Sequence, residues 1–243
     1  MTTPQPDDKH LSRLRALLAL ATDKRTPFHE RETAAAKAAE FMARHGIDEA
    51  KARAARGDAP EGLKVSPFGV ANSDGHGQAR SLMVTAVAAA MGCECLIMQA
   101  PPPRAYTVSI AGITSDVDAA RLLLPLIIAQ AHYAAASSAS DTQRRDRAYL
   151  PSFLLSYGRT VADRIAARRK PLTDATANPG TALILADRAE RLAALVAERF
   201  GTEFTSVSMH ATGSGAQAGH RAGQTADIGD ARLNNASRRA IDR

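Results

Sequence analysis

Residues 63–71, LKVSPFGVA, begin the stretch that decides the fold, because they alternate in the manner of a half-buried strand. The loop NSDGHGQ at 72–78 follows and starts an apolar helix that ends at Gly92. Residues 93–99, CECLIMQ, and 106–111, YTVSIA, predict two further strands with a proline-rich turn between them. The helix allows a parallel crossover, whereas the short turn favours an antiparallel pair. The stretch therefore predicts a β-α-β-β unit with a small mixed sheet.

Helical periodicity dominates the chain before this unit. Apolar residues recur at three-and-four spacing from Leu11 to Ala21, and a second helix begins at Thr26 and Pro27 and ends at Gly46. The two segments predict a helical hairpin with Ala-rich inner faces, and a short third helix near 48–56 completes the unit. We therefore expect two domains: an N-terminal helical hairpin unit at 1–57, and an α/β domain with a helical second half at 58–243.

The chain after the sheet is mostly helical. Ser115 and Asp116 predict the cap of a long helix, residues 134–143 a flexible run, and Pro151 the start of another helix. The composition of residues 171–180 indicates a linker. A helix at 182–200, with residues 181–185 as an alternative strand, and a final strand at 204–209 follow. The fold class is therefore α/β of the α+β kind, with several long helices packed on the sheet.

Composition limits the classes of function. Apolar residues make up 45% of the chain and charged residues 23%, which is sufficient for a folded core. Aromatic residues contribute 4%, with no Trp, which disfavours a stacking platform for single-stranded nucleic acid. Cys93 and Cys95 share one face of a strand as small apolar side chains, with a redox or metal pair as the alternative. No export signal or membrane span is evident, so we expect a cytoplasmic protein without membrane contact.

The histidines show no metal-ligand spacing. The segment from His29 to Thr33 lacks the second histidine that a zinc-binding helix needs. A site that the fold assembles from distant residues, such as His210 with His220 or with the two cysteines, stays open as an alternative. No metal or cofactor is predicted, and no nucleophile motif identifies a catalytic residue.

Glycines at 213–223 allow two interpretations. The segment GSGAQA at 213–218 imitates the start of a dinucleotide fingerprint after a predicted strand, but the remaining chain is too short for a nucleotide fold. Alternatively, Gly215, Gly219 and Gly223 recur every four residues and form a smooth helix face against which another backbone packs. The second interpretation is favoured by the spacing.

Basic charge is concentrated in residues 143–170. This segment holds eight basic residues against Asp146 and Asp163, a local excess that equals the formal charge of +6 for the whole chain. Arginine suits bidentate contacts with phosphate, so the segment predicts association with DNA or RNA. The candidate nucleic-acid-binding residues are Arg144, Arg145, Arg147, Arg164, Arg168, Arg169 and Lys170. A plain solvated surface is the alternative.

Several segments resemble an uncharacterised bacterial and phage family, the domain-of-unknown-function family twenty-seven eighty-six, in its actinobacterial form. The stretches that carry the resemblance are LLALA at 17–21, Glu32 with AKA at 36–38, MARHGI at 42–47, SDV at 115–117, SFLLSYG at 152–158, ALILADR at 182–188 and GHRAG at 219–223. The resemblance implies an architecture and no activity.

Two further functions compete with nucleic-acid association. A hydrolase-like enzyme would build its site from the loops at 72–78 and 210–220, whose Gly, His and Asp content suits catalysis. An adaptor would bind a protein partner through the Ala-rich hairpin. A pocket that joins the two loops would favour the enzyme.

Overall fold

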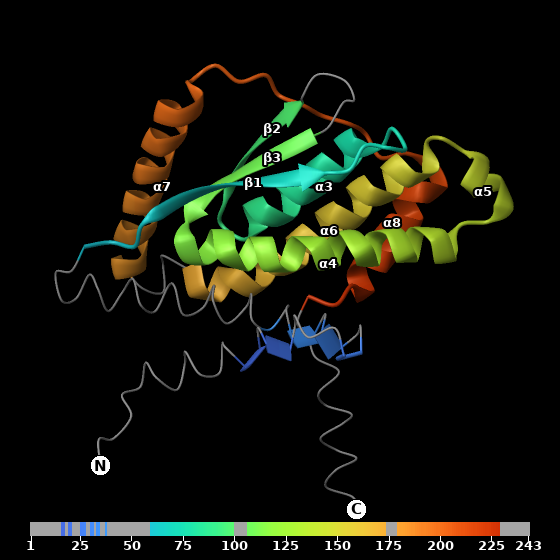
Figure 1. The fold of residues 1–243 in the computed structure, drawn as a ribbon, viewed down its shortest axis with the longest axis horizontal. Coiled ribbons are helices and arrows are strands. Elements are labelled where there is room, and N and C mark those ends of the chain that lie inside the picture. Colours follow the sequence, from blue (N-terminus) through green and yellow to red (C-terminus); the bar gives the residue numbers. More distant parts are fainter. Residues whose placement is uncertain are drawn as a thin grey trace, which may run out of the picture.

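The computed structural model describes residues 59–99, 106–173 and 179–228, together with parts of 16–37 (Figure 1). Three strands and six helices lie in the continuous ranges. They are β1 (Leu63–Val70), α3 (Gly77–Ala90), β2 (Glu94–Gln99), β3 (Tyr106–Ile113), α4 (Thr114–Ser138), α5 (Asp141–Arg145), α6 (Tyr149–Thr173), α7 (Pro179–Phe200) and α8 (Gly213–Thr225). The predicted combination of a small sheet with long helices is confirmed, and the fold is α+β.

The sheet has the strand order β1-β3-β2, and both pairs are antiparallel. Leu63 pairs with Ile113 at one end of the first pair, and Gln99 pairs with Tyr106 in the second. The predicted mixed sheet is therefore wrong, although β1 and β2 do run in the same direction. A helix about 10 Å wide spans more than one strand spacing of about 4.8 Å, so the α3 crossover leaves room for β3 between them.

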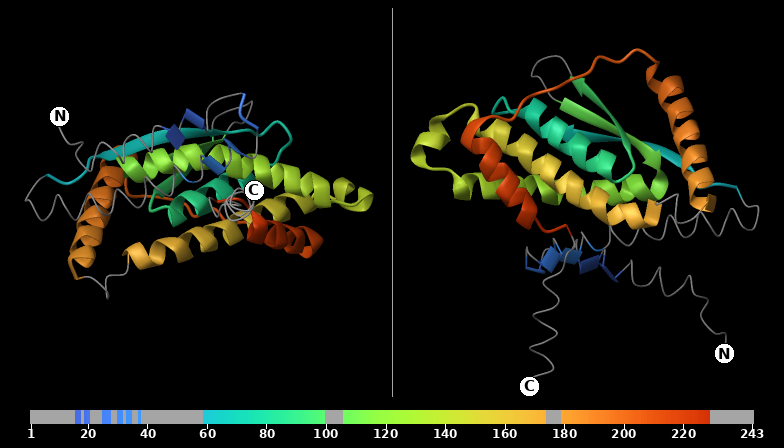
Figure 2. Two further views of the ribbon diagram at one scale, coloured as in Figure 1. Left: turned by 90° about the horizontal axis from the view of Figure 1, so that it is seen from below. Right: turned by 180° about the vertical axis from the view of Figure 1, so that it is seen from behind.

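The two faces of the sheet carry different partners. Val108 and Ile110 of β3 belong to the main core, which α3, α4 and α6 complete. Ala111 points to the opposite face and packs with Leu192 and Val196 of α7. Accordingly, α7 lies at one end of the molecule, apart from the other long helices (Figures 1 and 2). By length and composition alone α4 is apolar enough to span a membrane, and Leu124 and Ile127 are among its residues that are buried in the core.

Helix α8 packs directly on the backbone of α6. A Cβ atom added at Gly215 would lie 2.4 Å from the Tyr149 carbonyl oxygen, and one at Gly219 would lie 2.2 Å from that of Phe153. At Gly223 the added atom would meet Thr160 Cβ at 2.7 Å. All three glycines are buried, so the predicted smooth glycine face is confirmed. The dinucleotide fingerprint is wrong, because this glycine run contacts a helix and does not follow a strand.

Helix α6 is also approached closely from its other side. A Cβ atom at Gly158 would lie 2.6 Å from Met83 Cγ and 3.0 Å from Met83 Cα, so α3 packs against this glycine. Phe153 and Tyr157 lie between these contacts and stack with ring centroids 6.0 Å apart. Helix α6 is therefore the centre of the helical layer, with close-packed neighbours on two sides.

Several expected boundaries are corrected. Residues 201–212 form neither helix nor strand, so the strand predicted at 204–209 is wrong, and its apolar side chains are exposed. Residues 181–185 are helical within α7, and α6 continues to Thr173 into the predicted linker. The run at 134–143 holds the end of α4 and the start of α5. Ser115 and Asp116 do not cap α4, because Glu61 accepts hydrogen bonds from the N–H and the hydroxyl of Ser115.

Most of the predicted hairpin, the helix near 48–56 and the boundary at 57 lie outside the described residues. The described residues between 16 and 20 and between 30 and 37 are helical, and the Pro27 carbonyl oxygen accepts a hydrogen bond from the Arg31 N–H at 3.1 Å. Ala34 is buried, and the Thr33 hydroxyl donates to Asp227 Oδ2 at 2.9 Å. The second helix of the hairpin therefore contacts the segment that follows α8.

The glycine contact predicts a large loss of stability when a methyl group is added. Gly219→Ala should lower the free energy of unfolding by about 3 kcal/mol, because the helices must separate or distort to relieve a clash with backbone atoms. Chemical denaturation measures this change. Gly69→Ala is the matched control, since a Cβ atom there meets nothing within 4 Å, and its stability should stay within about 1 kcal/mol of the original protein. Equal stabilities of the two variants would contradict the packing.

Candidate nucleic-acid interface

The predicted basic residues separate into two groups. Arg144 and Arg145 belong to α5, Arg147 follows it, and all three are exposed. A capping box formed by Ser140 and Gln143 begins this short helix. We call Arg144, Arg145 and Arg147 the arginine corner. It lies at the end of the molecule opposite α7 (Figure 1).

The arginines in the middle of α6 hold the end of α8. Arg164 Nη1 donates to the carbonyl oxygens of Gly223 and Ala226, both at 2.8 Å, and Arg168 Nη1 donates to that of Ile228 at 2.8 Å. The last carbonyl groups of a helix lack partners within it, and cations near them are favourable. These two side chains therefore have a structural role.

The last two predicted residues also lie apart from the arginine corner. Arg169 forms a two-pronged ion pair with the buried carboxylate of Asp116, at 3.1 and 3.2 Å. Gly92 lies directly over this pair, where an added Cβ would come within 2.9 Å of both partners. Lys170 is exposed near the end of α6, roughly 30 Å along the helix from its start at the arginine corner. The structure thus brings together three of the seven predicted residues.

A cavity of about 310 Å³ lies beneath the arginine corner. The three arginines and Asp146 line its rim, while His76 and His132 contribute imidazoles from the loop before α3 and from α4. Its inner wall includes Ala135 and Tyr149, both 4% exposed. Arg144 also donates to the carbonyl oxygens of Ala136 and Ala139, which fixes α5 against the end of α4.

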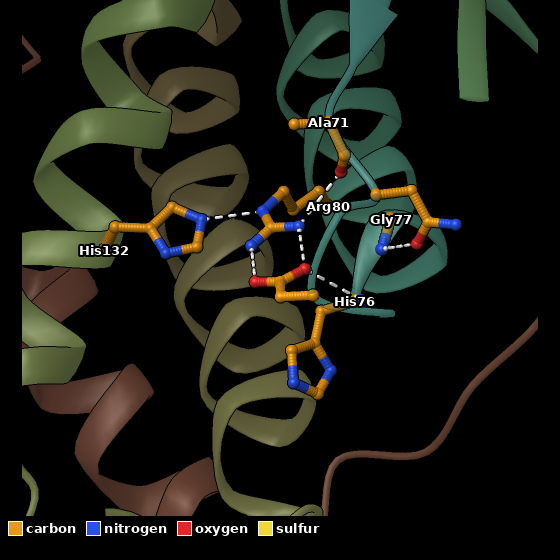
Figure 3. Close-up of polar contacts among 7 residues, drawn as sticks. Ala71, His76, Gly77, Arg80 and His132 are labelled. Atoms are coloured by element: carbon orange, nitrogen blue, oxygen red, sulfur yellow. Dashed lines mark hydrogen bonds and ion pairs between the residues drawn. The ribbon is translucent and has the colours of Figure 1, made fainter. Parts of the chain in front are cut away.

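A buried arginine connects the loop that carries His76 with His132 of α4 (Figure 3). Arg80 of α3 pairs with both carboxylate oxygens of Asp74 and donates to the Ala71 carbonyl oxygen at 2.9 Å. Its Nε donates to His132 Nε2 at 2.8 Å. Asp74 also accepts a hydrogen bond from the His76 N–H at 3.1 Å. One guanidinium therefore connects the loop at 71–77, α3 and α4.

This network sets the protonation of its members. The hydrogen bond from Arg80 holds the pKa of the Asp74 carboxyl well below its usual range, so Asp74 is ionised. Burial, and then the charge of Arg80, lowers the pKa of His132. Because His132 Nε2 accepts a hydrogen bond, the neutral ring carries its proton on Nδ1. Figure 3 shows that second nitrogen turned away from Arg80, which makes His132 a fixed donor.

A second hollow of about 530 Å³ adjoins the cavity, and Gln143 lines both. Its wall carries neutral hydrogen-bonding groups from α4 and α8, including Ser137, Ser214 and Gln217, and one cation, Arg221. The two hollows therefore adjoin each other, with arginines on either side of Gln143.

The network of Arg80, Asp74 and His132 was not predicted from the sequence, although a charged residue on the apolar face of α3 indicated it. Arg80 occupies the same helical stripe as the buried Met83, Val84 and Val87. A charge on a buried face requires a partner, and Asp74 in the preceding loop was the nearest carboxylate in the sequence.

The other candidate chemical groups are not assembled. None of residues 210–220 lines the cavity at His76, so this cavity does not join the two loops expected of an enzyme. His220 Nδ1 is instead 2.9 Å from the Thr160 hydroxyl. Burial raises the pKa of the Cys95 thiol to about 12 and that of Cys93 further. Both thiols are therefore protonated at neutral pH and are not activated nucleophiles.

Comparison with known proteins concerns the N-terminal segment. Residues 9–49 match the model of a family described as a protein of unknown function, DUF2786. The resemblance stated from the sequence is thereby confirmed for this segment. No curated protein and no solved structure matches the chain. The residues of the arginine corner and the cavity lie after the matched segment.

The structural role of Arg164 predicts a loss of stability. Arg164→Met keeps much of the aliphatic length but removes two hydrogen bonds to carbonyl groups at the end of α8, so the free energy of unfolding should fall by about 2 kcal/mol. Arg159→Met, at an exposed position of the same helix, should change it by less than about 0.5 kcal/mol. Urea denaturation compares the two. Equal losses of unfolding free energy in the two variants would show that the hydrogen bonds from Arg164 do not stabilise the fold.

The buried histidine predicts a pH dependence. Since the folded protein lowers the pKa of His132 below its ordinary value of 6.5, the unfolded chain binds more protons as the pH falls below that value. The stability should therefore decrease from pH 7 to pH 5. His132→Gln retains an acceptor for Arg80 and does not titrate, so its decrease should be smaller. The stability of both proteins is measured by denaturation at each pH. Equal decreases in the original protein and in His132→Gln would show that His132 does not cause the pH dependence.

Proposed function

We propose that this protein binds nucleic acid by phosphate contacts from the arginine corner. The observation that carries the proposal is the convergence of three exposed guanidiniums on one cavity. Arg145 and Arg147 make no hydrogen bond or ion pair with any described residue, so their donors are available to a ligand. Guanidinium groups match the oxygen geometry of phosphate, and such contacts supply most of the affinity of nonspecific complexes.

The surface next to the arginine corner supports a longer contact. Hydroxyl and amide side chains are common partners of phosphate and sugar oxygens, and the second hollow offers Ser137, Ser214 and Gln217 beside Arg221. Since Gln143 lines both hollows, a strand could follow the surface from the arginine corner to Arg221. The groups involved contact phosphates and sugars, which supports binding with little preference for sequence.

The proposal predicts a salt-dependent affinity that decreases when single arginines are removed. Binding to fluorescent double-stranded DNA should weaken by orders of magnitude between about 50 and 200 mM salt, because each phosphate contact releases counterions. Arg145→Gln and Arg147→Gln should each reduce the slope of log affinity against log salt by about 0.9. Fluorescence anisotropy gives both quantities, and single-stranded DNA and RNA are measured in parallel.

Arg199→Gln is the matched control. Arg199 is exposed near the end of α7, far from the arginine corner, and its replacement removes the same single charge. Its slope should equal that of the original protein. Absence of binding to all three nucleic acids at low salt would refute the proposal. Equal losses in all three variants would mean that net charge alone governs the affinity.

A further inference from the structure

We propose that the cavity beneath the arginine corner binds a phosphate monoester at the end of a nucleic-acid chain. This inference rests on the proposed function, because it assigns a specific part of the bound strand to the cavity. The size of the cavity, its charge and the chemistry of its walls support this assignment.

The size of the cavity suits one terminal nucleotide. At about 310 Å³ the cavity lies at the lower limit of ordinary small-molecule sites, which span about 300 to 1,000 Å³. Ala135 and Tyr149 are buried on its inner wall. Because Gln143 lines both hollows, a strand that follows the second hollow can end in this cavity.

The charge of the lining matches a monoester. Three guanidiniums and the carboxylate of Asp146 leave a net charge of +2 when the two histidines are neutral. A phosphate monoester carries about −1.5 to −2 at neutral pH, whereas an internal phosphodiester carries a single negative charge. Arg80 adds little to this balance, because its charge is paired with Asp74. A terminal phosphate would therefore balance the positive charge of the lining almost completely. An internal phosphodiester would balance only about half of it.

The walls supply suitable partners for both parts of a terminal nucleotide. Arg145 and Arg147 can donate to phosphate oxygens at the rim, and His132 provides a neutral donor that Arg80 holds in place. Leu150 and the alanines of α4 give the cavity an apolar side for the sugar or base. The His132 donor is therefore held in place on α4 before the ligand arrives, which reduces the entropy lost on binding.

The test compares oligonucleotides that differ only at their ends. Three otherwise identical single strands carry a 5′-phosphate, a 3′-phosphate or hydroxyl groups at both ends, and their affinities are measured by anisotropy at one salt concentration. We expect at least one phosphorylated strand to bind about tenfold more tightly than the hydroxyl strand, as one or two charged hydrogen bonds allow. Equal affinities of all three would overturn the inference and leave the proposed function standing.

A variant that fills the cavity localises the effect. Ala136 is exposed on α4 and lines the cavity, so Ala136→Met should fill the cavity and remove the preference for the end phosphate. Ala193→Met, at an exposed position of α7, is the matched control and should keep the preference. Retention of the preference in both variants would place the end phosphate elsewhere and overturn the inference.

Free nucleotide is the other source of the same chemical group. AMP should displace the phosphorylated strand, and adenosine at the same concentration should not. Binding of AMP without any preference among the three strands would overturn recognition of a chain end. Failure of every strand to bind at low salt would refute the proposed function itself, so the two failures are distinguishable.

Discussion

The arrangement of this protein depends on the close contact of α8 with α6. Gly215 and Gly219 allow the two helices to approach until backbone meets backbone, at Tyr149 and Phe153. Gly158 allows a similar approach between α6 and α3. A chain without Trp and with few aromatic residues has few large side chains to fill wide gaps between helices. Small residues at the contacts solve this problem, because they let the helices pack at high density without large spacers.

This contact also positions the candidate site. Gly215 rests on the carbonyl group of Tyr149, and Tyr149 forms part of the inner wall of the cavity. The start of α6 is thereby held in place, and with it the turn that carries Arg147. On the other side, Arg80 ties the loop at 71–77 to α4 through Asp74 and His132. The cavity therefore lies between two rigid connections, and its imidazole and guanidinium groups come from elements whose relative positions are fixed.

Arginines of one segment of the chain perform two different tasks. Arg164 donates to a carbonyl group in the last turn of α8, Arg168 donates to the segment that follows this helix, and Arg169 neutralises a buried carboxylate. Arg145 and Arg147 are exposed and available to a ligand. The net charge of the segment does not show which arginines are structural and which are available to a ligand, since each contributes one positive charge. The position of each guanidinium relative to helix ends and buried acids decides which task it performs.

The α+β class, β1, β2 and β3 and the glycine face of α8 could be predicted from the sequence, because these features depend on local periodicity and on residue size. It also identified the basic segment from composition. The position of β3 between β1 and β2 could not be predicted, since strand order depends on the width of the crossover helix and on contacts distant in sequence. For the same reason only the folded chain showed that three of the seven candidate residues share a site, and that His76 and His132 join them from separate elements. Helical spacing places residues along one helix, whereas a cavity forms between helices, and its composition is set by how their surfaces meet.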